Sequence, residues 1–172
     1  MGISILLTGP PRCGKTTLIK QVVAGYTNPS GGFYTQEICE GDRRVGFEVV
    51  TLDGQRGVLA HVDIQSRYRV GKYGVDLTAL EDLGVGAIRC ALDEKRLVVI
   101  DEIGPMETFS QTFCQVVSKA IAGDAKVLGT IVKRSTTFTD TLKQMPQVKL
   151  IDVRSDNRDG LADWILQYVR DA

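Results

Sequence analysis

The stretch Gly9-Pro10-Pro11-Arg12-Cys13-Gly14-Lys15-Thr16 matches the pattern G-x-x-x-x-G-K-[ST] of a phosphate-binding loop. A short apolar run, Ile3 to Leu7, precedes it and has the length of a buried strand. The apolar residues that follow recur at helical spacing until about Gly25. A strand that turns through glycine into a helix directs several backbone N–H groups, and the positive end of the helix dipole, at one point. We therefore predict that this turn binds the phosphates of a nucleoside triphosphate.

The lysine and threonine that end this stretch have separate predicted roles. Lys15 should reach the β- and γ-phosphates and take part in catalysis, and the Thr16 hydroxyl should ligate Mg²⁺. Backbone groups matter more than side chains in the rest of the loop. The residues predicted to contact the nucleotide are Gly9, Pro10, Pro11, Arg12, Cys13, Gly14, Lys15, Thr16, Thr17, Asp101, Glu102 and Gly104.

A second buried strand, Leu97 to Ile100, ends in the acidic pair Asp101-Glu102. Asp101 is predicted to hold Mg²⁺ together with Thr16 at the carboxyl end of this strand. Glu102 is predicted to be the catalytic carboxylate that polarises the water attacking the γ-phosphorus. With Gly104 the pair also fits the pattern D-x-x-G of regulatory GTPases, but no guanine-reading N-K-x-D follows it. Guanine specificity is therefore not predicted.

The composition is ordinary for a soluble globular protein. A chain of 172 residues with 43% hydrophobic and 24% charged residues predicts one domain over residues 1–172. Lys and Arg number 21 and Asp and Glu number 21, so no excess of positive charge indicates binding to nucleic acid or to a membrane. The four cysteines form no C-x-x-C pair, which argues against a zinc site or a disulfide framework. With no run typical of a signal peptide or a membrane span, we expect a cytoplasmic protein.

An antiparallel meander is predicted at about residues 32–62. Three runs, Gly32 to Cys39, Val45 to Leu52 and Val58 to Val62, have the character of strands joined by short turns. Strands so closely joined must run antiparallel. Outside the meander, strands alternate with helices, which predicts an α/β fold of three layers with a mostly parallel central sheet. Whether the meander extends that sheet or packs as a separate flap stays open.

Capping signals predict where the later helices begin. Asp76 should cap a helix that runs to about Glu94 and is broken near its glycines, and Ser110 should cap the next. The polar segment 63–74 is predicted to be a mobile loop. The last helix should bury one apolar face, made of Leu161, Trp164, Ile165, Tyr168 and Val169.

For several polar side chains two interpretations remain: they contact the nucleotide, or they are simply exposed to solvent. The cations after the strand near residue 130 lie where they would sense γ-phosphate charge. The basic residues of segment 63–74 would form a lid over the triphosphate, and the pair that opens the final helix would lie near the base. These side chains are Lys133, Arg134, Arg67, Arg69, Lys72, Asn157 and Arg158. The lone histidine, His61, is expected to be structural.

Five segments resemble the family of small nucleoside-triphosphatases known from thermophiles, to which the vertebrate cancer-related nucleoside-triphosphatase belongs. They are G-P-P-R-C-G-K-T-T, G-G-F-Y-T-Q-E-I, R-V-G-F-E-V-V-T-L-D-G, K-Y-G-V-D-L and V-V-I-D-E-I-G-P-M-E, spread through nearly the whole chain. The resemblance implies a P-loop NTPase domain with a RecA-like sheet. It also implies slow, Mg²⁺-dependent hydrolysis of several nucleoside triphosphates (ATP, GTP, CTP and UTP) to diphosphate and phosphate.

By position, the resemblance assigns phosphate binding to Gly9–Thr16, Mg²⁺ to Asp101 and the catalytic acid–base role to Glu102. Members of the family often have a histidine before the arginine that follows the late strand. This chain has Lys133 there, so the resemblance assigns no role to that position.

Two alternatives to hydrolysis remain at this point. A nucleotide or small-metabolite kinase would use the same loop and would shield the γ-phosphate from water. A nucleotide-dependent regulatory module would hydrolyse slowly as a timer. The oligomeric state and the physiological substrate have no signature in the sequence.

Overall fold

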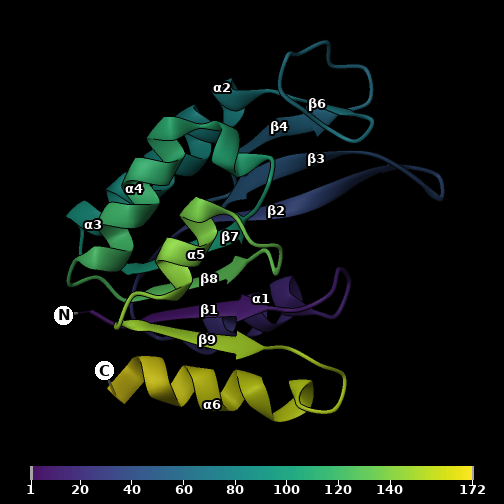
Figure 1. The fold of residues 1–172 in the computed structure, drawn as a ribbon. Helices are drawn as coiled ribbons and strands as arrows, with labels where there is room; N and C mark the ends of the chain where they lie inside the picture. Colours follow the sequence, from purple (N-terminus) through teal and green to yellow (C-terminus); the bar gives the residue numbers. More distant parts are fainter. Residues whose placement is uncertain (1, 172) are drawn as a thin grey trace.

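The computed structural model describes residues 2–171 and contains a single sheet covered by helices (Figure 1). The strands are β1 Ser4–Thr8, β2 Ser30–Glu40, β3 Arg43–Thr51, β4 Arg56–His61, β5 Arg69–Val70, β6 Tyr73–Val75, β7 Leu97–Ile103, β8 Val127–Ile131 and β9 Val148–Asp152. The helices are α1 Lys15–Gly25, α2 Leu77–Ala79, the π-helical η1 Leu80–Val85, α3 Gly86–Asp93, the 3₁₀ turn η2 Glu107–Phe109, α4 Gln111–Ala122, α5 Thr137–Lys143 and α6 Arg158–Asp171.

The strands follow the spatial order β5-β6-β4-β3-β2-β7-β8-β1-β9. Neighbours from β2 to β9 pair in parallel, and neighbours from β5 to β2 pair antiparallel. The expectation of a mostly parallel sheet is therefore wrong: the sheet is mixed. The physical reason is that the meander does not pack as a flap but continues the central sheet, because β2 pairs with β7 on one side and β3 on the other.

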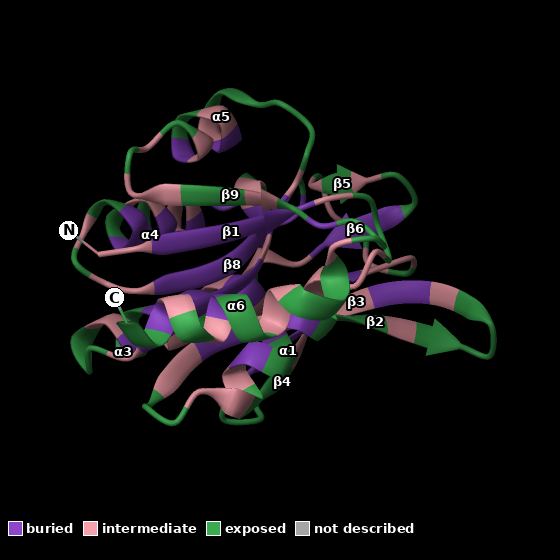
Figure 2. Ribbon diagram, turned by 90° about the horizontal axis from the view of Figure 1, so that it is seen from below, coloured by how far each residue is buried: buried purple, intermediate pink, exposed green. Residues whose placement is uncertain are grey.

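Helices cover both faces of the parallel half, as the predicted three layers require. On one face α1 and α6 pack over alternate residues of β1, among them Ile5 and Leu7. On the other face α3, α4 and α5 pack over a cluster that includes Leu6. Because both faces are covered, β1 and β8 are buried along their whole length (Figure 2). This accounts for the continuous apolar runs in these strands.

The two predicted helix caps are confirmed. The Asp76 carboxylate accepts a hydrogen bond from the Thr78 backbone N–H at 2.8 Å, and Ser110 Oγ accepts one from the Phe113 N–H at 3.0 Å. The predicted break near Gly84 takes the form of the π-helical stretch η1 inside a continuous helical segment.

Two local expectations are wrong. Segment 63–74 is not entirely loop, since it contains β5 and the start of β6, which pair with each other. Trp164 is not buried: 39% of it is exposed, while Ile165 and Val169 fill the interface. Trp164 instead stacks on Tyr168 with the ring centroids 5.1 Å apart, and the Lys149 ammonium lies over both rings. Aromatic faces that attract a cation are stable at a partly solvated surface, which explains why helical spacing alone misplaced this residue.

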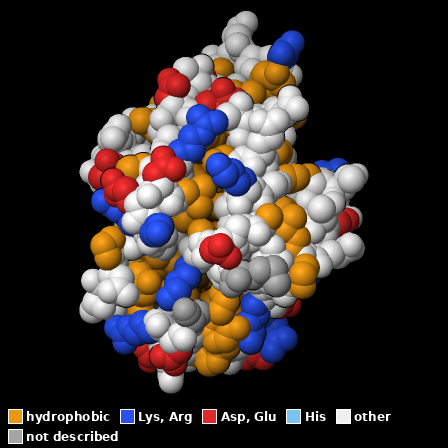
Figure 3. Space-filling model, turned by 90° about the vertical axis from the view of Figure 1, so that its left-hand side faces the viewer, with side chains coloured by type: hydrophobic (Ala, Val, Ile, Leu, Met, Phe, Trp, Pro, Cys, Tyr) orange, Lys and Arg blue, Asp and Glu red, His pale blue; other side chains and the backbone are white. Residues whose placement is uncertain are grey.

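The surface carries both signs of charge. On the face shown in Figure 3, lysine and arginine side chains are interspersed with aspartate and glutamate. Among the helices of residues 2–171, none has the length and apolar character of a membrane span.

Candidate active site

The loop between β1 and α1 has the backbone conformation that phosphate binding requires. Gly9 has φ 148° and Gly14 has φ 98°, and Arg12 between them has φ 61°. A Cβ at Gly9 would lie 2.7 Å from the Val153 carbonyl oxygen, so no larger residue fits there. Helix α1 begins at Lys15 directly after Gly14. The sequence motif therefore forms the predicted turn, with the N-terminus of an eleven-residue helix at its end.

The side chains of Lys15 and Thr16 lie on the inner side of this turn. Lys15 Nζ donates to the carbonyl oxygens of Gly9 at 3.0 Å and Pro10 at 2.8 Å, which holds the ammonium at the mouth of the loop. Thr16 Oγ1 donates to Asp101 Oδ2 at 2.7 Å, although the two residues are 85 positions apart. The two predicted metal ligands are thus in direct contact.

Asp101 is held from two sides at the floor of the site. Thr130 Oγ1, on β8, donates to its Oδ1 at 2.6 Å. The residue is 2% exposed, and this burial raises the pKa of its carboxyl, against the effect of the hydrogen bonds from Thr130 and Thr16 and of the nearby Lys15 charge. A hydroxyl and a carboxylate oxygen at this point form a donor set suited to a hard divalent cation such as Mg²⁺.

Glu102 lies one residue further along β7, where the pairing with β8 shifts register between Ile100 and Ile103. Such an irregularity re-aims the side chains of the strand. Burial raises the pKa of the Glu102 carboxyl, the Asp101 charge raises it further, and the Lys15 charge lowers it. The Glu102 carboxyl lines the same cavity as the lysine and the aspartate of the predicted site.

These groups line one cavity of about 870 Å³ at the carboxyl ends of the parallel strands. The part formed by predicted residues comprises Gly9, Pro10, Pro11, Arg12, Gly14, Lys15, Thr16, Thr17, Asp101 and Glu102, together with Lys133 and Arg134. Cys13 and Gly104 do not line it. Gly104 is buried beside the carboxyl groups, and Cys13 Sγ lies 3.8 Å from Lys15 Nζ.

The predicted lid is not formed by the basic residues of segment 63–74. Arg69 donates to the carbonyl oxygens of Ile64 and Lys72, Lys72 donates to the carbonyl of Arg44, and Arg67 donates to the hydroxyl of its neighbour Tyr68. None of the three basic side chains lines the cavity. Arg67 and Arg69 bond within segment 63–74, and Lys72 ties this segment to β3.

The two residues at the start of the last helix, Asn157 and Arg158, have different surroundings. Asn157 is structural: its side chain accepts from the Arg154 N–H at 2.8 Å and donates to the Asp152 carbonyl at 2.8 Å. Arg158 lies against the phosphate loop, where its Cδ is 3.0 Å from the place of a Cβ on Gly14. His61 is also structural, since its Nδ1 accepts from the Asp63 N–H at 3.2 Å.

The sequence analysis did not predict three charged residues that line the cavity, Glu37, Arg44 and Glu107. Glu37 on β2 bridges the phosphate loop and the meander: Arg12 Nη2 lies 3.5 Å and Arg44 Nη1 2.7 Å from its two carboxylate oxygens. Glu107, in η2, is 3% exposed and also faces the cavity. The motif Gly104 to Glu107 stood out in the sequence only as a family feature, and nothing in its spacing indicates that Glu107 turns back toward Glu102.

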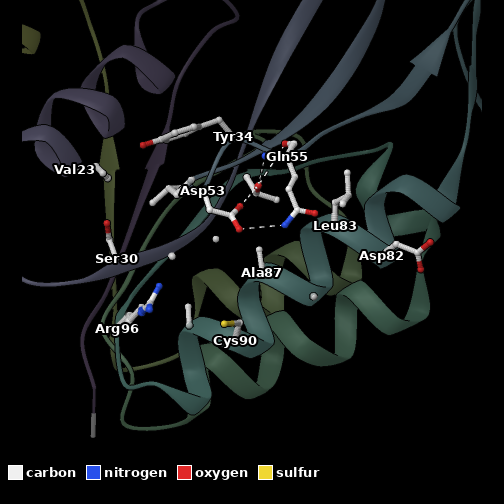
Figure 4. A pocket seen from close by; sticks show the side chains of 16 residues that line it. Val23, Ser30, Tyr34, Asp53, Gln55, Asp82, Leu83, Ala87, Cys90 and Arg96 are labelled. Atoms are coloured by element: carbon white, nitrogen blue, oxygen red, sulfur yellow. Dashed lines mark hydrogen bonds between the residues drawn. The ribbon is translucent and has the colours of Figure 1, made fainter.

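A second cavity, of about 520 Å³, lies between β2, the β3–β4 turn and α3 (Figure 4). Of its three charged lining residues, Asp53, Asp82 and Arg96, the first and the last have protein partners. Asp53 accepts from the Thr51 hydroxyl and from Gln55 Nε2, and Arg96 pairs with Glu94. The phosphate-loop cavity is therefore the better candidate for the active site.

A family model described as NTPase matches residues 4–166. The chain belongs to this NTPase family. Among its relatives, the nucleoside-triphosphatase THEP1 of Thermotoga maritima is 44% identical, covering 98% of this chain and 96% of that protein. The human cancer-related nucleoside-triphosphatase is 39% identical, covering 99% and 98%.

Solved structures of the NTPase family have the same fold. The crystal structure of THEP1 from Aquifex aeolicus superposes with a TM-score of 0.90 at 31% identity, covering 97% of this chain and 99% of that one. The solution structure of a human cancer-related nucleoside triphosphatase gives 0.85 at 37% identity, with 99% of each chain covered. The resemblance seen in the sequence is thereby confirmed.

Proposed function

We propose that this protein hydrolyses nucleoside triphosphates to diphosphate and phosphate with the help of Mg²⁺. The observation that carries the proposal is the contact of Thr16 with Asp101 at 2.7 Å, which brings the phosphate loop against the strand that presents Glu102. The names of the relatives, nucleoside-triphosphatases in bacteria and in humans, support the same activity.

Thr16 and Asp101 would hold the metal ion, whose charge would neutralise the β- and γ-phosphate oxygens when it is bound. The loop N–H groups and Lys15 would bind the same oxygens and stabilise the charge that develops on the leaving diphosphate. Lys15 is held by the loop carbonyls of Gly9 and Pro10 and by a long contact with Cys13 Sγ, and it can exchange these partly exposed partners for phosphate oxygens.

Glu102 would orient a water molecule and accept its proton as the water oxygen bonds to the γ-phosphorus and the bond to the β-phosphate oxygen breaks. Of the carboxyl groups that line the cavity, Asp101 is occupied by two hydroxyl donors. Glu102 is less buried than Asp101, and although burial and the Asp101 charge raise the pKa of its carboxyl, the Lys15 charge acts in the opposite direction and favours the ionised, proton-accepting form.

We further infer a RecA-like arrangement and broad tolerance of the base. The strand β8 lies between β1, which carries the phosphate loop, and β7, which carries the acidic pair. The cavity is lined by groups suited to phosphate, and residues 152–158, which the sequence placed near the base, do not line it. ATP, GTP, CTP and UTP are therefore the proposed substrates.

Phosphate release from ATP, GTP, CTP and UTP, with Mg²⁺ and with excess EDTA, tests the proposal directly. We expect release from all four nucleotides with Mg²⁺ and none with EDTA. Lys15→Ala should weaken nucleotide binding, whereas Glu102→Gln should keep binding and lose hydrolysis by about 100-fold or more. Release by Glu102→Gln at the rate of the parent protein would exclude the assigned role of Glu102.

One observation favours a kinase as the second candidate. The cavity is also lined by Phe47 and Leu59 of the meander, which are apolar side chains that phosphate and a metal ion do not call for. An acceptor molecule would fit against them. ADP and free phosphate measured in the same reaction, with and without hydroxyl acceptors, separate the two functions: ADP in excess of phosphate indicates transfer, and equal amounts indicate hydrolysis.

A further inference from the structure

Arg12 combines a disfavoured backbone conformation with an exposed, charged side chain. It has φ 61°, and among residues 2–171 the other non-glycine residue with positive φ is Lys95, at 54°. In this conformation the Cβ of a residue approaches the following carbonyl oxygen, so glycine is the residue that the backbone favours. The chain nevertheless has an arginine here, inside the phosphate loop. Backbone strain of this kind is concentrated at functional sites.

The ion pair that Arg12 makes does not explain why the strain is kept. Its Nη2 lies 3.5 Å from Glu37 Oε2, and the two side chains are 74% and 36% exposed. Ion pairs this long between solvated side chains contribute little to stability. Glu37 also has a closer partner, because Arg44 Nη1 lies 2.7 Å from its other carboxylate oxygen, and Arg44 Nε donates to the Tyr73 hydroxyl at 3.1 Å. Glu37 therefore stays paired when Arg12 moves away.

The contact with Glu37 places the Arg12 guanidinium on the β2 side of the phosphate loop. Arg12 belongs to the loop after β1 and Glu37 to β2, and in the sheet β8 and β7 lie between these two strands. Strand β7 carries Asp101 and Glu102, which line the same cavity as Arg12 and Lys15. A guanidinium released from Glu37 is therefore on the side of the loop where the terminal phosphate is expected.

We propose that Arg12 is a catalytic residue, whose guanidinium leaves Glu37 and donates hydrogen bonds to the γ-phosphate oxygens as the terminal phosphoryl group is transferred to water. This inference rests on the proposed function, because it adds a second cation to the site where Lys15 binds the phosphates. A planar guanidinium matches two phosphate oxygens at once, and a terminal phosphate carries more negative charge than one carboxylate. An arginine in this role raises kcat by about 10³–10⁵-fold.

Three substitutions separate the charge of Arg12 from its backbone conformation. Arg12→Gln removes the charge and keeps a side chain at positive φ, whereas Arg12→Gly removes the side chain and relieves the strain. Both should lower kcat by about 100-fold or more and raise KM by less than about tenfold, as measured by steady-state phosphate release with Mg²⁺. Arg12→Lys keeps a charge but not the planar fork, so its kcat should lie between those of the parent and Arg12→Gln.

Thermal unfolding distinguishes this catalytic role from a structural one. Arg12→Gly should melt no lower than the parent, because glycine adopts positive φ without strain. Lys95→Gly is the matched control, since it relieves the same conformation at an exposed turn after α3 that does not line the cavity. It should also melt no lower than the parent, and it should keep the parent kcat.

A binding measurement tests whether Arg12 contacts the group in transfer. ADP with Mg²⁺ and aluminium fluoride mimics the phosphoryl group during transfer, and ADP with Mg²⁺ alone lacks that group. Arg12→Gln should weaken binding of the aluminium fluoride complex by about tenfold or more and change the affinity for ADP by less than about threefold.

A kcat of Arg12→Gln equal to that of the parent would overturn the inference, and so would equal losses of affinity for ADP and for its aluminium fluoride complex. A melting temperature of Arg12→Gly well below that of the parent would assign Arg12 a structural role instead. Failure of the underlying proposal gives a different result. In that case Glu102→Gln would hydrolyse at the parent rate, whatever the Arg12 variants do.

Discussion

Replacing Thr130 by valine removes one hydrogen bond from the floor of the site without changing the volume of the side chain. Thr130 is 1% exposed, and its hydroxyl donates to Asp101 Oδ1 at 2.6 Å. A hydrogen bond to a charged group contributes about 1.5–3 kcal/mol. For a domain of this size each kcal/mol shifts the melting temperature by about 2–4 °C, so Thr130→Val should melt roughly 3–12 °C below the parent.

The difference in stability between Thr130→Val and the parent should also depend on pH, and the pKa of Asp101 determines in which direction. Burial already raises the folded-state pKa of this carboxyl above its unfolded value, against the effect of the Thr130 hydrogen bond. Without that bond the folded-state pKa rises further. An acid with a raised pKa destabilises the fold at pH values above that pKa, and the penalty is lost as the pH falls toward the unfolded value. The gap in stability between Thr130→Val and the parent should therefore narrow as the pH is lowered from 7 toward 4.

Thermal unfolding followed by circular dichroism, in EDTA and without nucleotide, measures both effects. Thr130→Ser is the matched control, because it keeps the hydroxyl and loses only a methyl group. At pH 7, Thr130→Ser should lower the melting temperature less than Thr130→Val does. A valine variant as stable as the parent, or a gap that widens on acidification, would refute the assignment of the hydrogen bond to a charged Asp101.

Two further predictions concern the phosphate loop and the last helix. Gly14→Ala should weaken binding of a nucleotide analogue about tenfold, because alanine at φ 98° costs about 1–2 kcal/mol and its Cβ would lie 3.0 Å from Arg158 Cδ. Gly86→Ala, in a helix with open space at its Cβ position, is the control and should leave the affinity measured by titration unchanged. In urea unfolding, Ile165→Ala should cost about 2–5 kcal/mol because the residue is fully buried, and Trp164→Ala should cost about 1 kcal/mol. A larger cost for Trp164→Ala would contradict its surface position.

The sequence was sufficient to predict the features that are formed by residues adjacent in the chain. The phosphate loop, the caps at Asp76 and Ser110 and the hairpin turns each depend on a few adjacent residues, and the structure has them as predicted. The meeting of Thr16 with Asp101 was also predictable, because the motif specifies a phosphate site and parallel strands present their carboxyl ends at one edge.

The features that the sequence did not predict depend on how distant segments are arranged in space, and local sequence patterns do not contain this information. Whether the meander continues the sheet is decided by β2, whose residues Ser30–Phe33 pair with β7 as well as forming the start of the hairpin. Glu107 escaped notice because a 3₁₀ turn reverses the chain after β7 and returns its carboxyl to Glu102. Trp164 has the spacing of a buried residue, but it lies at the edge of the helical interface and is stabilised by Lys149.

The strand β2 has a consequence for how this enzyme admits and encloses its ligands. Phe33 is paired with Ile100 of β7 and with Thr51 of β3 at the same time, so the backbone ladder passes from the parallel half of the sheet into the meander without a break. Bending there would rupture hydrogen bonds on both sides of one strand. The meander should thus move together with the phosphate-loop cavity as one rigid wall, and not as a flap that opens over it.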